Sequence, residues 1–218
     1  MKQFIFSKVL PACLLVTSWG FGELNQDNDF QIWALSDVRK RINSCLEFEF
    51  QSEYRFGNNA SELFLYYFQS QIIYSPTDWL KIAPGYRQQE TKPLSDRGWF
   101  TSYDPLMAVS FSFCLGKTEV IDRSLIQYFI NEDLPNFWFF RHSDTFRFRP
   151  IGSFHPILSE EFFFTDRGDF VQNRMEFGGY LPVRGAGELV AVYLLRHQKF
   201  KGEWRAAHAL RIKLFLAF

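Results

Sequence analysis

The chain has 218 residues, enough for one domain, and its 24 basic residues balance its 24 acidic residues. This balance argues against a nucleic-acid-binding protein, which needs a concentrated basic patch. Aromatic residues make up 19% of the chain and include 27 phenylalanines. A soluble domain of this size would struggle to bury so many rings, whereas hydrocarbon around the outside of the fold would remove the difficulty.

The first 22 residues resemble a secretory signal peptide, with a basic start, a short apolar stretch and small residues at its end. Lys8 and Pro11 interrupt the apolar stretch. An uncleaved anchor helix is therefore the weaker alternative, because a membrane-spanning helix needs about 20 apolar residues. We expect residues 1–22 to be removed and residues 23–218 to form one exported domain.

After this segment the hydropathy pattern repeats every two residues, which is typical of β-strands. The clearest example is Cys45–Phe56, where apolar and aromatic residues alternate with charged or polar ones. A membrane strand needs about 9–11 residues, whereas strands of globular proteins average about 5–6. Length and pattern together predict strands that face lipid on one side and a watery lumen on the other.

Further segments with this pattern follow along the chain, and the connections between them alternate roughly between short and long. With Cys45–Phe56, the predicted strands are 30–36, 63–74, 79–89, 103–113, 119–130, 138–149, 158–165, 173–181, 188–196 and 208–218. The pattern is least regular in 119–130, which leaves the register of that hairpin open.

The sequence thus predicts an all-β fold, a closed antiparallel up-and-down transmembrane β-barrel. The segments number eleven, but a single-chain bacterial barrel has an even number of strands. We therefore expect ten strands, if 30–36 does not span the membrane, or twelve, if the pattern leaves one strand unmarked. Four tryptophans near strand ends predict an aromatic girdle at the membrane surfaces: Trp79, Trp99, Trp138 and Trp204.

The segment His208–Phe218 predicts the strand that closes the barrel. Its apolar face runs from Leu210 to Phe218, while Arg211 and Lys213 lie on the opposite face. Since the first and last strands of a closed barrel are neighbours, we expect these two cations to pair with glutamates near the start of the barrel: Glu47, Glu49 and Glu53. The expected partners are outer-membrane lipid and the barrel-assembly machinery, which would recognise Leu210–Phe218.

Charged residues on the polar faces of the strands are candidates for lining the lumen. They are Glu47, Glu49, Glu53, Arg55, Arg87, Arg147, Arg149, Arg174, Glu176, Arg196, Arg211 and Lys213. Barrels of this size have narrow interiors that side chains largely fill, and unpaired buried charge is costly. We expect a network of salt bridges that braces the wall, with a narrow channel for small polar solutes as the alternative.

One segment carries a base and a nucleophile, His142 and Ser143, but adjacent strand residues point to opposite faces and cannot readily pair. His142 and Asp144 share a face, and an outward serine on a neighbouring strand could complete a hydrolase at the lipid boundary. No glycine-flanked serine motif supports this hypothesis. The remaining histidines and cysteines have no metal-ligand spacing, so we expect no metal or cofactor. A disulfide between Cys45 and Cys114 is a minor alternative to two free thiols.

Several blocks, in their order, resemble the DUF2490 family, an uncharacterised family of outer-membrane-type barrels. They are the strand around Trp33, Leu46–Phe56, Trp79–Ile82 with Gly85–Arg87, Phe146–Arg149, Glu160–Phe163, Gln172–Arg174 and His208–Phe218. The resemblance covers about residues 28–218. It implies an outer-membrane barrel and brings no assigned activity or catalytic residue.

We therefore expect an integral outer-membrane β-barrel, structural or a narrow pore, in preference to an enzyme. One alternative is an embedded enzyme acting on lipid or lipopolysaccharide. Another is a soluble periplasmic barrel of the lipocalin type, which would turn the aromatic face of Cys45–Phe56 inward and its charges outward. The sequence does not indicate an oligomeric state.

Overall fold

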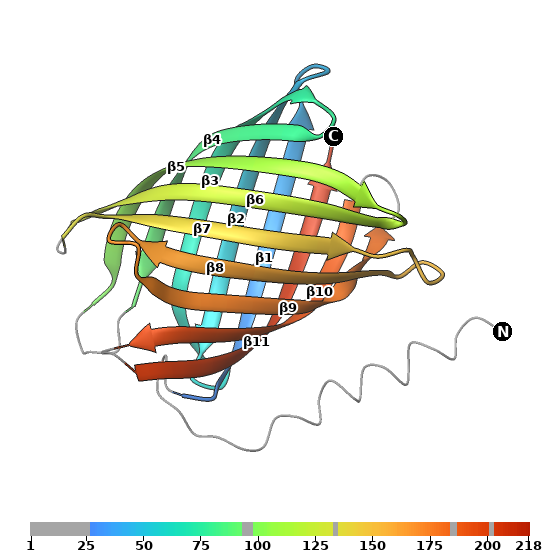
Figure 1. Ribbon diagram of the computed structural model, residues 1–218. Helices are drawn as coiled ribbons and strands as arrows, with labels where there is room; N and C mark the ends of the chain where they lie inside the picture. The colour runs from blue at the N-terminus through green and yellow to red at the C-terminus, as the bar shows by residue number, and fades with distance from the viewer. Residues whose placement is uncertain (1–26, 93–97, 133–134, 184–186, 201–202) are drawn as a thin grey trace.

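The computed structural model describes residues 27–92, 98–132, 135–183, 187–200 and 203–218, and the expected signal peptide lies outside these ranges. The described residues form a closed barrel of eleven strands (Figure 1). Their bounds are β1 Asp29–Arg41, β2 Leu46–Gly57, β3 Glu62–Thr77, β4 Leu80–Thr91, β5 Phe100–Leu115, β6 Thr118–Asn131, β7 Phe137–Arg147, β8 His155–Thr165, β9 Phe170–Val183, β10 Gly187–Phe200 and β11 Glu203–Ala217. Within these ranges no helix is long and apolar enough to cross a membrane.

Each strand pairs with its neighbours in the chain in antiparallel fashion, and the barrel closes where β1 pairs with β11 in parallel. The parallel seam follows from the odd number of strands, since strands that alternate in direction leave the first and the eleventh pointing the same way. It runs from the pair Asp29 and Ala207 to the pair Arg39 and Ala217. We refer to the two ends of the barrel as the Asp29 end and the Arg41 end, after the first and last residues of β1.

The expectation of ten or twelve strands is wrong. The predicted strand 30–36 is part of β1, which has 13 residues and pairs on both sides. Its second half was missed because Asp37, Arg39 and Arg41 do not look like a membrane strand in isolation. They point into the lumen or lie at its rim, where charges are tolerated.

Hydropathy alternates from one residue to the next along the strands, and successive side chains point alternately into the barrel and out of it. In β2, Phe48, Phe50 and Tyr54 are 37–40% exposed, whereas Glu49 and Glu53 are 3–4% exposed. The charged face of this strand therefore lies inside, which is the reverse of the arrangement that the lipocalin-type alternative requires.

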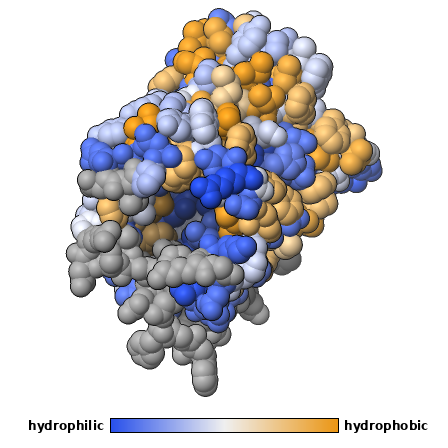
Figure 2. Space-filling model, turned by 60° about the vertical axis from the view of Figure 1, so that its left-hand side comes forward, coloured by the Kyte–Doolittle hydropathy of each residue, from blue (hydrophilic) through white to orange (hydrophobic). Residues whose placement is uncertain are grey.

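The outer wall is rich in exposed apolar and aromatic side chains, which Figure 2 shows beside hydrophilic residues on one face of the molecule. Near the two ends of the barrel Trp79, Trp99, Trp138 and Trp204 are 43–54% exposed, as the girdle prediction requires. Trp33 differs from these four because it is inside the barrel and 1% exposed.

The irregular hydropathy of 119–130 does not reflect an irregular strand. β6 pairs in continuous register with β7 from Glu119 to Phe129, and its outward residues include Asp122 and Ser124. The predicted alternation of connection lengths holds only in part, since seven residues join β7 to β8 and two residues join β10 to β11. Cys45 and Cys114 are both free thiols.

The parallel seam can be tested with paired cysteines in a background where Cys45 and Cys114 are serine. Ala34 and Ile212 are register partners, and neighbouring strands lie about 4.8 Å apart, within the Cα range of a disulfide. Oxidation should therefore link Ala34→Cys to Ile212→Cys, detected by mass spectrometry of the digested protein.

The control pair is Ala34→Cys with Leu216→Cys, which is displaced by four residues, or about 13 Å along the strand. Little crosslinking is expected there. Failure of the first pair to crosslink in folded protein would contradict the direct pairing of β1 with β11.

Candidate functional site

The lumen contains a cavity of about 380 Å³ that extends from the middle of the barrel towards the Arg41 end. Its depth is indicated by the exposure of the arginines that line it. Arg55, Arg87 and Arg174 are 7–8% exposed, whereas the side chain of Arg147, close to the Arg41 end, is 39% exposed. The cavity is therefore open to water at the Arg41 end and narrows towards the middle of the barrel.

Below the cavity, towards the Asp29 end, side chains from both sides of the barrel fill the lumen. We call this region the packed layer, and its most buried members are 0–1% exposed: Asp29, Gln31, Trp33, Asp104, Gln127 and Leu194. A channel would leave its lining residues in contact with water. The most buried members of the packed layer do not meet this condition.

Hydrogen bonds and cation–π contacts hold the packed layer together. The indole of Trp33 donates to Gln31 at 2.9 Å, and Gln31 donates to Asp29 at 2.8 Å. The guanidinium groups of Arg55 and Arg174 lie 3.9 and 5.0 Å from the Trp33 ring centroid. Such contacts are worth more when the cation is shielded from water, so Trp33 helps to hold these arginines at the bottom of the cavity.

Ion pairs brace one side of the cavity. Glu161 accepts from Arg141 at 2.9 and 2.6 Å and from Arg174 at 3.3 Å. Lys213 lies 2.6 Å from Asp37, and Arg211 pairs with Glu176. Further pairs join Arg39 to Glu47 and Glu49, and Arg55 to Glu53.

The expected partners of Arg211 and Lys213 were wrong in detail. The closing strand does neighbour the first, but that first strand is β1, so Lys213 meets Asp37. Arg211 reaches across β10 to Glu176 on β9. The glutamates at 47, 49 and 53 lie on β2 and pair with arginines of β1 and β2 instead.

Most of the predicted lumen residues line the cavity. They are Glu49, Glu53, Arg55, Arg87, Arg147, Arg174, Glu176, Arg211 and Lys213. Glu47 pairs with Arg39 and Arg41 close to the rim, and Arg196 is buried with its guanidinium 6.0 Å from the Trp33 ring. Arg149 was predicted wrongly, because β7 ends at Arg147 and the following residues form an exposed connection.

Several charged residues of the cavity were missed, for identifiable reasons. Asp37 and Arg39 lie beyond the predicted end of the first strand. Arg123 lies in the segment with irregular hydropathy, and Glu161 adjoins Glu160, so that neither could be assigned a face by pattern alone. Paired acids within a strand are a useful signal, since one of them must point inward.

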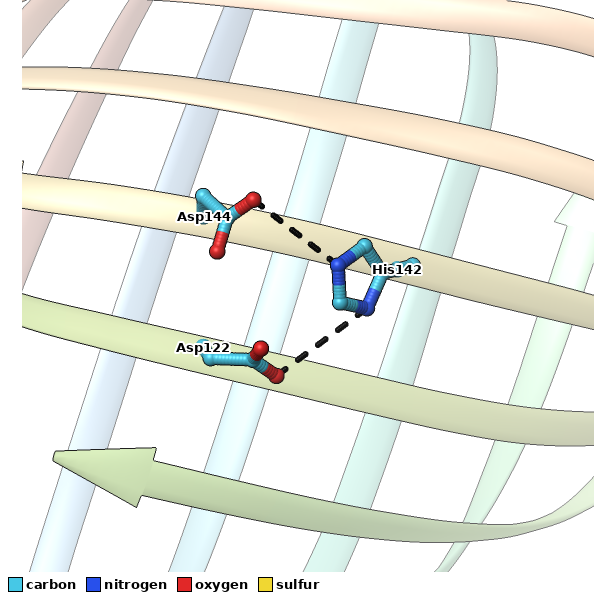
Figure 3. A group of neighbouring side chains, drawn as sticks. All are labelled: Asp122, His142 and Asp144. Carbon is cyan, nitrogen blue, oxygen red and sulfur yellow. Dashed lines mark ion pairs between the residues drawn. The ribbon is translucent and has the colours of Figure 1, made fainter.

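A second group of polar residues, the outer-wall cluster, lies outside the barrel on β6 and β7: Asp122, Ser124, His142 and Asp144. Ser124 Oγ is 3.1 Å from His142 Nδ1, and the carboxylates of Asp122 and Asp144 lie 4.0 and 3.8 Å from the ring nitrogens. Figure 3 shows the imidazole between the two carboxylates. The structure thus places a serine of a neighbouring strand beside His142, as the hydrolase hypothesis requires.

Two kinds of chemistry suit the outer-wall cluster. A serine hydroxyl next to an imidazole is a nucleophile with a base. Alternatively, Asp122, His142 and Asp144 offer ligand atoms within 4.8 Å of one another, a set that could hold a divalent cation. Sequence spacing missed this group because its members lie on two paired strands.

The strands and their inward charges define the class of this protein as a closed β-barrel with a polar lumen. The chain belongs to the DUF2490 family, described as a protein of unknown function, whose sequence profile matches residues 30–207. The match runs from β1 into β11 and confirms the family expected from the sequence blocks. No curated protein matches the chain. A family without a known function transfers none, so function is argued from the site itself.

The ion-pair network predicts a large effect of Glu161→Gln. Among the described residues, Glu161 is the only carboxylate that pairs with both Arg141 and Arg174. Its replacement leaves two largely buried guanidinium groups without this acidic partner. We expect a loss of about 3 kcal/mol in the free energy of unfolding, measured by urea titration in lipid vesicles.

The matched control is Glu160→Gln, one residue away on the opposite face of β8. It removes the same charge without breaking a lumen ion pair and should not lower stability. Equal losses in the two variants would show that the network does not brace the barrel.

Proposed function

We propose that this protein is an integral outer-membrane β-barrel whose lumen is a blind polar cavity instead of a conducting pore. The observation that carries the proposal is the division of side chains across the wall, with apolar rings outside and paired charges inside. Soluble monomers rarely expose contiguous apolar patches of more than a few hundred Å². A surrounding hydrocarbon layer would make this outer wall favourable.

Strand length and closure support the same proposal. The strands have 11–16 residues, at least the length that a tilted strand needs to cross a bilayer. A closed barrel leaves no sheet edge unpaired, which is the condition for a β-structure in lipid. The signal-like residues 1–22 and the segment Leu210–Phe218 fit export and assembly in the outer membrane, with lipid and the assembly machinery as partners.

The packed layer favours a blind cavity over a narrow pore. Asp29 and Gln31 on β1 and Asp104 on β5 are buried at the same end of the lumen, although they come from different sides of the barrel. Solute passing through would have to displace these side chains and the Trp33 ring. On this account the channel interpretation of the lumen is the weaker one.

The test has two parts. Washing of membranes with urea should leave the protein in the membrane fraction and detergent should extract it, whereas the purified protein in planar bilayers should give no steady conductance. Phe50→Arg puts a charge on the outer face and should impair insertion at a cost of about 2–4 kcal/mol. The control Gln51→Arg puts the same charge into the cavity and should insert.

Release of the protein by urea would contradict the membrane proposal. A steady conductance of the wild-type protein would contradict the blind cavity and revive the pore.

The outer-wall cluster supports a second candidate, an enzyme that cleaves acyl esters of membrane lipids. Ser124 would attack the ester carbonyl while His142 takes its proton, the alcohol would leave, and water would then release the fatty acid. An oxyanion would form in the first step and needs hydrogen-bond donors. The backbone of β6 and β7 is paired on both sides at this level, and Asp122 adds a like charge, so this candidate ranks second.

The enzyme candidate predicts that the protein releases fatty acid from phospholipid in mixed micelles and that Ser124→Ala and His142→Ala each abolish the release. Ser143→Ala is the control, because Ser143 points into the lumen. Absence of fatty-acid release by folded wild-type protein would remove the enzyme from consideration.

A further inference from the structure

We propose that the lumen cavity binds a small polyanion, and that the anion lies against the part of the wall formed by β3, β4, β5 and β6. The proposal rests on the proposed function, since it takes the cavity as blind and open to water at the Arg41 end. The starting observation is a charge excess. Ten lysines and arginines line the cavity against six aspartates and glutamates, which leaves four positive charges in excess.

The excess is concentrated on the part of the cavity formed by β3, β4, β5 and β6, which we call the acid-free wall. Its lining residues include Lys81, Arg87 and Arg123 but no aspartate or glutamate. Among the described residues none of these three cations has a carboxylate within 4.0 Å. The six acids that line the cavity all belong to the remaining strands.

Neutral groups position one of these cations without compensating its charge. Arg87 donates to the side-chain oxygen of Gln69 at 3.0 and 2.7 Å, and its guanidinium lies 3.9 Å from the centroid of the Tyr67 ring. Arg87 is 7% exposed. A guanidinium that is buried, fixed in place and unpaired with an acid is a favourable partner for an incoming anion.

The charged groups that act on Arg123 are two cations and two acids. The cations are Arg87 and Arg141, which carry the same charge as Arg123. Those acids are already engaged, because Glu49 pairs with Arg39, and Glu161 pairs with two arginines. An anion bound beside Arg123 would relieve this repulsion.

The register of the strands leaves room for such an anion. Lys81, Ser110 and Arg123 are aligned across β4, β5 and β6. The Cα atoms of the two cations are therefore about 10 Å apart, which is two strand spacings. Ser110, which lies between them, has a small side chain that offers a hydroxyl. A phosphate or carboxylate group placed over Ser110 would be within reach of both long side chains.

The dimensions of the cavity limit the ligand to a small molecule. At about 380 Å³ it is near the lower end of ordinary ligand pockets, which hold about 300–1,000 Å³. The ligand class that fits size and charge is therefore a soluble polyanion with phosphate or carboxylate groups.

The experiment titrates pyrophosphate and citrate into the purified protein in detergent micelles, with calorimetric detection. Both should bind, more weakly as salt is added. Lys81→Gln and Arg123→Gln should each lower the affinity about tenfold, whereas Lys81→Arg, which keeps the charge, should retain binding. Lys40→Gln is the matched control, because Lys40 lies on the outer face of β1 and is exposed, and it should leave the affinity unchanged.

Absence of binding of either anion would overturn the inference. Equal losses in Lys40→Gln and Arg123→Gln, or equally tight binding of the polycation spermidine, would also overturn it. A protein that stays in urea-washed membranes and does not conduct, yet binds neither anion, would refute this inference and leave the proposed function intact. A conducting wild-type protein would refute the proposed function whatever the anion titration gives.

Discussion

Closure of the sheet by the parallel pairing of β1 with β11 is the constraint on which the rest of the structure depends. Without this seam, both strands would present an unpaired edge, and the inward side chains would not be enclosed. With it, eleven strands confine the inward charges to a narrow lumen. The pairs Lys213–Asp37 and Arg39–Glu49 form next to the seam, so closure and charge pairing reinforce each other.

Confinement also explains why the two halves of the lumen differ. Towards the Asp29 end, Trp33, Gln31 and Asp29 are buried, and hydrogen bonds join Trp33 to Gln31 and Gln31 to Asp29. Towards the Arg41 end, small residues such as Ala108 and Ser110 leave space. Lys81, Arg87 and Arg123 therefore line a part of the cavity that is free of acids, since all six lining acids belong to other strands. The same wall thus braces the barrel where charges pair, and we propose that it binds an anion where they do not.

The sequence predicted the orientation of strands better than their number. In β2 the alternation of Phe48 and Phe50 with Glu49 assigns each side chain to a face without any knowledge of the fold. The pattern itself marks eleven segments, and the predicted number is wrong because the rule of even strand numbers does not hold for this barrel. Parallel closure depends on how two distant segments meet, and hydropathy in either segment alone does not reveal it.

The outer-wall cluster shows another limit of sequence reasoning. Asp144 and His142 share a face by simple alternation, and this much was predictable. Ser124 lies opposite His142 because of the register of β6 against β7. Polar residues interrupt the apolar side of β6, and this interruption hides the register in the sequence. The interruption was itself informative, because polar residues on a lipid-facing side of a strand would be costly, so their presence there suggests a functional role.

The central claim is that the barrel wall separates hydrocarbon outside from water inside. It is tested most directly by spin labels placed one at a time along Leu46–Phe56, in a background without Cys45 and Cys114, with the protein in lipid vesicles. Labels at Phe48, Phe50 and Tyr54 should be relaxed by oxygen dissolved in the lipid. Labels at Glu47, Glu49 and Gln51 should respond instead to a water-soluble nickel complex or to neither. Loss of this alternation, or access of the nickel complex to the outer positions, would contradict the account.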